Sequence, residues 1–304
     1  MISGIFLIFF RGVMFMDDEY LLPYACLYQN SAGEILRFDG REDAPYLIQT
    51  SAMFDYQWSM TTYDRARRDG GRLVFARRAV QDKSLVLDVF ADTQAAHNAA
   101  LNRLHDVLDY DVCHLSPGRL YINNHYIECF ASVSVKTLDR DWTTYSVVGL
   151  TFKVISPAWT KDYSHTLAAG TVSLTFPDTS IDEENGLSSA DETPMTITIY
   201  GSCVNPVVTV GGNQYGVNIT LSSSSDYVVI DQQNKKIRAC RNGVWANVFN
   251  LRNKTTDVFQ PAPTFADAAG SRLSVSRSDS NGSAAFAVDV VFHVRRSEPR
   301  WNEN

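Results

Sequence analysis

The stretch DGGRLVFARRAVQDKSLVLDVFADTQAAHNAALNRLHDVLDY, residues 69–110, contains the two patterns that decide the fold. Asp69-Gly70-Gly71 accepts the positive φ of a tight reversal, and the runs RLVFARRA and SLVLDVFA are strand-like. The pattern then becomes helical, with Asp92 or Thr93 as N-cap. The apolar stripe of this helix is Ala100, Leu101, Leu104 and Leu108. We therefore predict a hairpin, a strand and one helix that lies on a sheet.

Strand patterns continue on both sides of this stretch. GEILRF (33–38) and YLIQTSAMFDYQW (46–58) precede it, and RLYINNHYIECFASVSVK (119–136) follows it with Asn123-Asn124 as a two-residue hairpin turn. In YSVVGLTFKVISP (145–157) apolar and other residues alternate, as in a half-buried strand. The residues expected to face the core are Val148, Leu150, Phe152 and Val154.

The second half of the chain shows many short strands and no helix. Strand-like runs recur from residue 195 to residue 294, and Asn281-Gly282 is a strong hairpin signal. An acidic, Ser-rich segment at 178–193 is typical of an exposed loop. We predict a mainly β fold with two β-sandwich-type modules, a first one at 17–162 with the single α-helix and a second one at 163–304.

Residues 1–16 are mostly apolar but too short for a membrane span. No lysine or arginine precedes their apolar run and no small-residue cleavage site follows it, so they do not fit a signal peptide. Two interpretations stay open. Either translation starts later, at Met14 or Met16, or the segment is an apolar arm that packs on a neighbouring subunit. No membrane insertion is expected in either case.

The composition argues against several classes of function. The 304 residues carry a formal net charge of -7 and a pI near 5.4, which disfavours general binding to nucleic-acid phosphates. The five cysteines are widely spaced and never form a CxxC pair. We therefore expect reduced thiols and neither a disulfide framework nor a zinc site.

No motif for catalysis or cofactor binding is present. The sequence lacks GxxxxGK[ST], GxGxxG, GxSxG and HExxH, and no two histidines have the spacing of metal ligands on one face. Cys113 and His114 are expected on a strand, where adjacent side chains point to opposite faces and cannot act as a thiolate and base. We predict no catalytic residues, no metal and no cofactor.

A basic cluster surrounds the Asp69-Gly70-Gly71 turn. Its members are Arg65, Arg67, Arg68, Arg72, Arg77 and Arg78. Three interpretations stay open: a solvated hairpin flank, a subunit or partner contact through arginine–carboxylate pairs, and a nucleic-acid contact.

The chain ends in RRSEPRW (295–301), which is unusually charged and aromatic for a free terminus. In an extended chain Arg296, Glu298 and Arg300 share one face, so Glu298 can bridge both guanidiniums. Pro299 ends the strand and Trp301 has a ring to bury. We predict that this tail docks on its own protein or on a neighbouring subunit.

Taken in order, these segments resemble the distal tail protein family of long-tailed, non-contractile bacteriophages and related prophages of Gram-positive hosts. The resemblance is carried by LYQNSAGEILRF, DGGRLVFARRAVQDKSLVLDVFADT, SPGRLYINNHYIECFASVSV and ISPAWTK in the first half. In the second half it is carried by YGSCVNPVVTVGGNQYGVNITL, RNGVWANVFNLRN and RSEPRW. The apolar start and the 178–193 loop depart from the family pattern.

The resemblance implies a virion protein made in the host bacterial cytoplasm, without enzymatic activity. It implies a homohexameric ring at the tail tip that initiates tail assembly and joins the tail tube protein to baseplate, fibre or receptor-binding proteins. DNA would only pass through the channel. The first module would form the ring, and the second would be galectin-like or similar to a carbohydrate-binding module.

Two other functions remain as alternatives. One is a sugar-binding adhesin module, with Trp245, Tyr215 and Tyr227 as aromatic platforms. The other is a polysaccharide-degrading tail enzyme, for which the sequence offers no particular pair of carboxylates.

Overall fold

The computed structural model describes residues 22, 24–41, 44–64, 70–137, 144–168, 173–175, 193–254, 258–261, 274–280 and 286–299. The chain divides into two compact units, residues 1–157 with 298–304 and residues 158–297. The division therefore lies a few residues before the boundary expected at 162/163, because that position falls inside strand β10 (Trp159–Leu167). Residues 1–16 lie outside the described residues.

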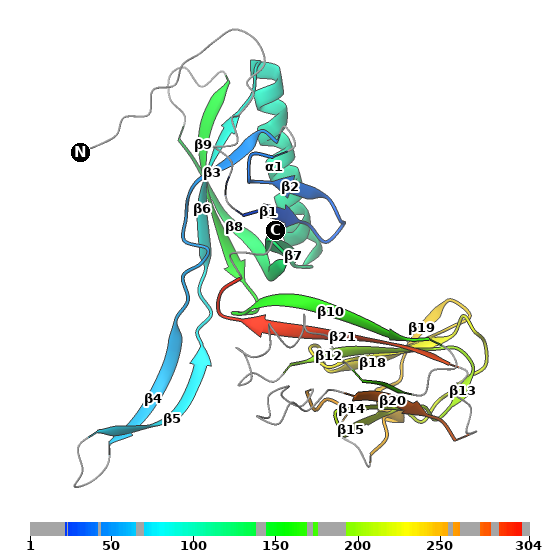
Figure 1. The fold of residues 1–304 in the computed structure, drawn as a ribbon. Coiled ribbons are helices and arrows are strands. Elements are labelled where there is room, and N and C mark those ends of the chain that lie inside the picture. The colour runs from blue at the N-terminus through cyan, green and yellow to red at the C-terminus, as the bar shows by residue number, and fades with distance from the viewer. Residues whose placement is uncertain are drawn as a thin grey trace. The chain divides into compact units, whose positions relative to one another are not determined.

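The first unit is built on an antiparallel sheet that we call the curled sheet (Figure 1). Its strands, in spatial order, are β3 (Tyr46–Ser51), β6 (Lys83–Phe90), β9 (Tyr145–Val154), β8 (His125–Thr137), β7 (Gly118–Ile122), β1 (Cys26–Gln29) and β2 (Ile35–Arg37). Its two ends approach each other, because Asp39 bridges Leu47 and the Ile48 amide donates to the Phe38 carbonyl at 3.0 Å.

Helix α1 (Gln94–His114) packs on the curled sheet. Thr93 is the N-cap, and its hydroxyl accepts from the Ala96 amide at 3.2 Å. All four residues of the predicted apolar stripe are buried, which confirms that part of the prediction. The helix runs on through Cys113 and His114, so their expected strand was wrong. A left-handed Leu115 ends the helix instead.

The predicted second hairpin is confirmed by the pairing of β7 with β8. Ile122 pairs with His125 around the turn, and Asn123 has the positive φ of 51° that such turns require. The alternation predicted for β9 is confirmed as well, because Val148, Leu150, Phe152 and Val154 are all buried.

The hairpin of β4 (Trp58–Asp64) and β5 (Gly71–Arg78) belongs to the first unit but forms a separate sheet, which extends away from the curled sheet (Figure 1). Gly70, beside its turn, has a φ of 93°. Residues 65–69 lie outside the described residues. We call this element the β4–β5 hairpin.

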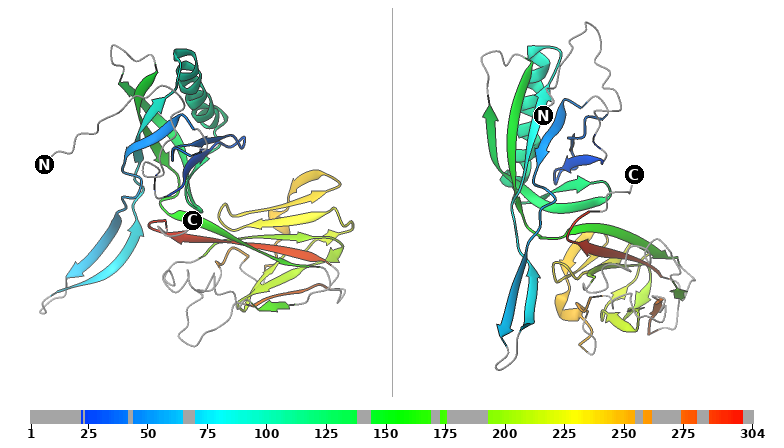
Figure 2. Two further views of the ribbon diagram at one scale, coloured as in Figure 1. Left: turned by 45° about the horizontal axis from the view of Figure 1, so that its top comes forward. Right: turned by 60° about the vertical axis from the view of Figure 1, so that its left-hand side comes forward.

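The second unit contains two sheets that share one core (Figure 2). The larger one, the long sheet, has the order β19 (Val244–Asn247), β18 (Lys236–Arg241), β17 (Tyr227–Asp231), β12 (Met195–Tyr200), β21 (Ala287–Arg296) and β10. The short sheet has the order β11 (Ser173–Thr175), β20 (Ser274–Ser278), β14 (Val207–Val210) and β15 (Asn213–Gly216). Two further pieces are the pair β13 (Cys203–Val204) with β16 (Thr220–Leu221) and the 3-10 helix η2 (Phe249–Leu251).

The core of the second unit lies between these two sheets, as in a β-sandwich. Ile197, Val228 and Val290 of the long sheet pack with Val208 and Val275 of the short sheet. The mainly β fold with a helix in the first module is thus confirmed. The galectin-like detail stays a prediction. Residues 178–192 and the Asn281-Gly282 turn lie outside the described residues.

Candidate assembly surface

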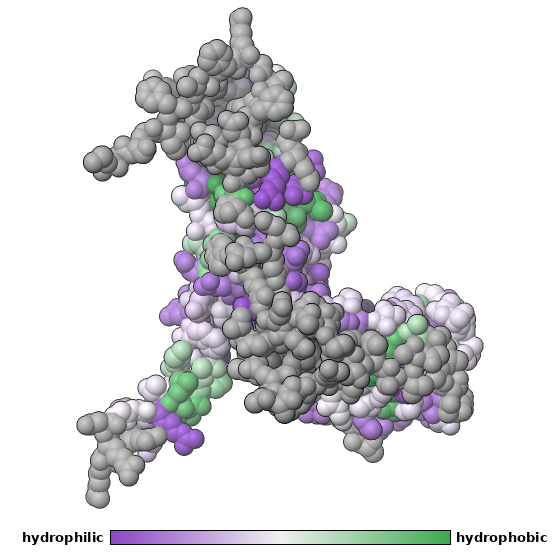
Figure 3. Space-filling view, in the orientation of Figure 1, coloured by the Kyte–Doolittle hydropathy of each residue, from purple (hydrophilic) through white to green (hydrophobic). Residues whose placement is uncertain are grey.

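The β4–β5 hairpin exposes apolar side chains along both of its strands. The exposed fractions are 60% for Met60, 59% for Tyr63, 52% for Leu73, 64% for Val74 and 54% for Phe75. Figure 3 shows hydrophobic side chains gathered on this hairpin. Exposed apolar side chains gathered in this way are typical of an interaction site.

The register assigns these side chains to both faces of the hairpin. Directly opposite residues of an antiparallel pair share a face. Met60 lies opposite Ala76 on one face, and Tyr63 lies opposite Arg72 on the other, where Phe75 also lies. A bulge at Val74 shifts the register between Thr61 and Thr62. One face therefore carries Trp58, Met60 and Leu73, while the other mixes Tyr63 and Phe75 with Ser59, Thr61 and two arginines.

The structure places part of the predicted arginine cluster on the same hairpin. Arg72 and Arg77 lie on the face of Phe75, because Arg77 pairs with Ser59 and Arg72 with Tyr63. Arg78 lies on the opposite face, with its guanidinium 5.0 Å from the Trp58 ring centroid. Arg65, Arg67 and Arg68 lie outside the described residues. The three described arginines thus belong to a mixed basic and apolar surface, and its role as a subunit or partner contact stays a prediction.

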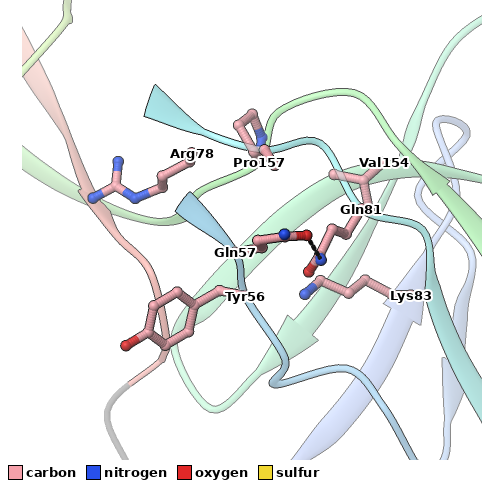
Figure 4. A pocket seen from close by; sticks show the side chains of 8 residues that line it. Tyr56, Gln57, Arg78, Gln81, Lys83, Val154 and Pro157 are labelled. Atoms are coloured by element: carbon pink, nitrogen blue, oxygen red, sulfur yellow. Dashed lines mark hydrogen bonds between the residues drawn. The ribbon is translucent and has the colours of Figure 1, made fainter. Parts of the chain in front are cut away.

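A small pocket lies at the root of the hairpin, lined by Tyr56, Gln57, Arg78, Ala79, Gln81, Lys83, Val154 and Pro157 (Figure 4). Gln81 donates to Gln57 at 3.0 Å across it, and the Lys83 ammonium donates to the Asp55 carbonyl. Burial lowers the pKa of Lys83, while Asp55 and Glu298 act in the opposite direction. The free volume is about 10 Å³, room for one water molecule rather than a ligand.

The C-terminal tail reaches the first unit at this root. Arg296 ends β21 opposite Trp159 in the second unit, but Glu298 belongs to the first unit and interacts electrostatically with Lys83. Pro299 is buried. Arg300 and Trp301 lie outside the described residues, so docking of the complete tail stays a prediction. The sequence pattern did not identify Lys83, because a lysine at the start of a strand gives no signal of burial.

A second exposed apolar surface lies at the far end of β8. Strand β7 stops opposite Cys129, and β8 continues beyond it to Thr137. The side chains of 132–137 are exposed, with exposed fractions of 48% for Val133 and 61% for Val135. The two apolar surfaces of the first unit therefore lie on different strands.

The long sheet of the second unit carries a triad-like arrangement. The Asp162 carboxylate lies 2.7 Å from His293 Nδ1, and the Thr196 hydroxyl lies 2.9 Å from His293 Nε2. Catalysis of acyl transfer also needs free backbone donors beside the hydroxyl. Here the neighbouring strands use their amides in sheet pairing, and the His293 amide donates to the Pro194 carbonyl. This arrangement links strands β10, β12 and β21 rather than forming a hydrolase site.

The described cysteines and histidines have structural surroundings. All five cysteines are free, and only Cys113 is exposed. His114 Nδ1 donates to the Tyr110 carbonyl at 2.8 Å and its ring stacks on the Tyr110 ring, so it does not serve Cys113 as a base. His97 is buried beside the Ser146 hydroxyl at 3.0 Å, and burial lowers its pKa.

Among the described residues, no group of three or more His, Cys, Asp or Glu side chains is arranged to hold a metal ion. Within the same part of the chain, no helix combines the length and apolar character needed to cross a membrane.

The aromatic platforms expected for sugar binding have different surroundings. Tyr215 is fully buried in the second core and its hydroxyl donates to the Pro261 carbonyl at 3.4 Å, so its expected role as a platform was wrong. Tyr227 and Trp245 lie together, with ring centroids 5.2 Å apart and planes at 89°. Trp245 is 49% exposed.

Comparison with known proteins gave matches among solved structures only. No protein-family model matches the chain, and no curated protein matches it either. The Dit (gp 19.1) protein of phage SPP1, described as a paradigm of the hub adsorption apparatus of phages that infect Gram-positive hosts, matches with a TM-score of 0.55 and 13% identity. That match covers 90% of this chain and 99% of the SPP1 protein.

Two structures of the phage P2 baseplate in its activated conformation, one with calcium and one with strontium, match as well. In each case the TM-score is 0.57 and the identity 10%, over 88% of this chain and 97% of the other. At such identities the likeness establishes the fold. The resemblance to distal tail proteins is therefore confirmed at the level of the fold.

Proposed function

We propose that this chain is a structural subunit of a phage tail-tip hub, a homohexameric ring that joins the tail tube to baseplate or fibre proteins and initiates tail assembly. The fold of the SPP1 hub protein over nearly the whole chain supports this assignment. The observation that carries the ring is the β4–β5 hairpin, which exposes apolar side chains on both faces, together with Arg72 and Arg77 on one of them.

An isolated two-stranded hairpin is only marginally stable in water. The β4–β5 hairpin pairs with no other strand of the described chain, and Met60, Leu73 and Phe75 each expose more than half of their surface. About half of each side chain is still exposed, so covering this part stabilises by about 0.8–1.5 kcal/mol each, half the value for full burial. A neighbouring subunit that covers the hairpin therefore stabilises both the hairpin and the ring.

A closed ring requires two different and complementary surfaces on each subunit. The first unit has two candidates, the β4–β5 hairpin and the exposed end of β8 with Val133 and Val135. Arg72 and Arg77 add cations to the first surface, which orients it towards carboxylates of a neighbour. We infer that the hairpin of one subunit lies against the next subunit around the ring.

The hub proposal assigns no catalysis and no cofactor to the chain. The partners are further copies of the chain, the tail tube protein, and tail-associated, fibre or receptor-binding proteins, all in the virion. DNA passes through the channel without specific binding. A net charge of -7 per subunit repels DNA phosphates, which favours passage over adhesion.

The test compares the full chain with a hairpin variant, Met60→Ser with Phe75→Ser, by native mass and negative-stain imaging over a range of concentrations. We expect six-fold rings from the full chain and monomers from the variant. The matched control is Ile35→Ser with Val112→Ser, which changes two exposed apolar residues of the same unit outside the hairpin. Rings that persist in the hairpin variant would refute the assigned contact, and a full chain that stays monomeric alone and with its tube protein would refute the hub.

A further inference from the structure

The long sheet of the second unit presents an aromatic row on the face opposite the shared core. The register places Tyr200 opposite Tyr227, Tyr227 opposite Cys240 and Cys240 opposite Trp245. Because directly opposite residues share a face, these side chains form one line across β12, β17, β18 and β19. Their neighbours along the strands, such as Ile199 and Val228, belong to the core, so the row faces outward.

The rings of this row contact one another in sequence. The Tyr200 and Tyr227 centroids lie 5.6 Å apart with planes at 39°, and the Trp245 ring stands at 89° to the Tyr227 ring. The Arg238 guanidinium lies 5.1 Å from the Trp245 centroid. Contacts of this kind hold the rings in defined orientations. The row is therefore ordered before any ligand arrives.

The row beside the aromatic row carries a hydrogen-bonding side chain on every strand except β17, which contributes Val229. Asp289 lies opposite Thr198 on one side and opposite Thr166 on the other, and Arg238 lies opposite Asn247. The Thr166 hydroxyl donates to Asp289 at 2.6 Å, and the Tyr200 phenol also hydrogen-bonds to this carboxylate. From β21 to β19 the row crosses four strand spacings, about 19 Å. This is a span that suits a short oligosaccharide.

The charges on this face are balanced. Asp231 pairs in register with Lys236, Asp289 and Arg238 lie in the neighbouring row, and Asp162 and Arg295 lie further along β10 and β21 on the same face. Three carboxylates thus stand with three cations, which gives no net attraction for a polyanion such as a phosphate-rich polymer. A neutral ligand with many hydroxyl groups suits this surface, because hydroxyls both donate and accept hydrogen bonds while the C–H faces of sugar rings pack on aromatic rings.

We propose that this outer face of the long sheet, made of Tyr200, Tyr227 and Trp245 with Asp289 and Arg238 beside them, is a binding site for a neutral polysaccharide. The aromatic rings carry the apolar faces of the sugar rings, and the carboxylate and guanidinium bind their hydroxyls. The site lies wholly within the second unit. It does not depend on ring formation, which is assigned to the first unit.

The test uses the full chain on an array of immobilised neutral oligosaccharides of hexoses and N-acetylhexosamines, with poly(glycerol phosphate) as the anionic probe. The strongest binder is then titrated calorimetrically. We expect Trp245→Ala to lower the affinity at least tenfold and Asp289→Asn to lower it several-fold. Val244→Ala, at the exposed neighbour of Trp245, is the matched control and is expected to bind as the full chain does. Melting curves of all variants establish that the second unit is folded.

The proposal would be overturned if the full chain bound none of the neutral oligosaccharides, or if Trp245→Ala bound them with unchanged affinity. Binding of poly(glycerol phosphate) alone, abolished by salt, would overturn it in favour of an anionic ligand. Rings that form without any sugar binding would refute this site while leaving the hub intact. Sugar binding by a chain that never forms rings would support this site and refute the hub.

Discussion

Two hairpins of the first unit, β7–β8 and β4–β5, differ in how much of their surface the rest of the unit covers. The β7–β8 hairpin closes through Asn123 and Asn124, and β7 alternates between buried and partly exposed residues under α1. The β4–β5 hairpin has the same antiparallel pairing, but every residue of β5 except Arg78 is exposed. The two hairpins share their antiparallel pairing, so they differ in the burial of their side chains and not in their backbone.

Alternation of buried and exposed side chains indicates a strand with one face on the core and one face in solvent. The core face of such a strand is covered within its own unit. The β4–β5 hairpin exposes apolar side chains on both faces, with Met60 on one and Phe75 on the other, where Arg72 and Arg77 also lie. No described element of its own unit lies on either face of it as closely as α1 lies on the curled sheet. Under the proposed function, β7–β8 therefore serves folding and β4–β5 serves assembly.

The largest expected effect comes from Gly118→Ala in β7. A Cβ at this position would overlap the Asp111 carboxylate and the Tyr28 ring, which are both buried. We expect a loss of about 3 kcal/mol or more in the free energy of unfolding. The control is Gly70→Ala beside the β4–β5 turn, where the φ of 93° is strained for alanine but space is open. It should cost about 1 kcal/mol. Chemical denaturation of both variants measures these two losses in the free energy of unfolding. A loss for Gly118→Ala smaller than that for Gly70→Ala would contradict the account.

Leu104→Ala should come next, because the side chain is fully buried between α1 and the curled sheet. The expected loss is about 2–5 kcal/mol. Phe75→Ala removes a larger side chain from the β4–β5 hairpin but should change monomer stability by no more than about 0.5 kcal/mol. Thermal and denaturant unfolding at a concentration that keeps the chain monomeric would show the contrast. Equal losses would mean that the hairpin packs in its own unit.

Tyr28→Phe tests the hydrogen bonds that connect β1 to α1. The Tyr28 phenol donates to Asp111, whose other oxygen accepts from the Ser31 amide at 2.7 Å. Burial and this bond raise the pKa of Tyr28. Removing the hydroxyl leaves a buried carboxylate with one donor fewer, at a cost of about 1–3 kcal/mol. Tyr145→Phe is the matched control, because its 2.7 Å bond to Asp88 is exposed, and its cost should be smaller. The reverse order would contradict the account.

The smallest effect is expected at a turn of the second unit. The Asp226 carboxylate accepts from the amides of Asn242, Ser222 and Ser223 at 3.1, 3.3 and 3.2 Å. These bonds lower the pKa of Asp226 below its usual value of 3.8. A lowered folded pKa gives stability that is present above the unfolded pKa and is lost as pH falls through the folded pKa. Melting temperatures from pH 6 to pH 2 should therefore fall slightly less for Asp226→Asn than for the unchanged chain.

An identical fall in both proteins would show that this turn contributes nothing to the pH dependence. Like the Asn123 turn of β7–β8, the Asp226 turn is closed within its own unit. Its contribution to stability should therefore be the same at every protein concentration, whereas the protection of the β4–β5 hairpin should rise with concentration.

Much of the fold could be predicted from local patterns. Thr93 and the Leu104 stripe defined the start and buried face of α1, and Asn123-Asn124 defined the β7–β8 turn, because N-caps, helical stripes and tight turns depend on nearby residues. The end of α1 could not be predicted, because Cys113 and His114 fit a strand as well as a helix. The cap there is Leu115, an uncommon residue for a left-handed conformation.

The candidate surfaces were only partly predictable. The arginines around Gly70 indicated this hairpin, but the distribution of its apolar side chains over both faces depends on the register and on the bulge at Val74, which the sequence does not display. Tyr215 and Trp245 look equivalent as aromatic residues in strands, yet one is buried and the other exposed. Which face of a strand meets the core is decided by the packing of both sheets.

Hydrogen exchange of the backbone amides at several protein concentrations tests the central claim most directly, because it follows both hairpins in one experiment. The account predicts that amides of β7 and β8 are protected at every concentration, while those of β4 and β5 exchange quickly in monomers and become protected when rings form. Equally fast exchange of β4 and β5 in assembled rings, or full protection in monomers, would contradict the assignment of this hairpin to assembly.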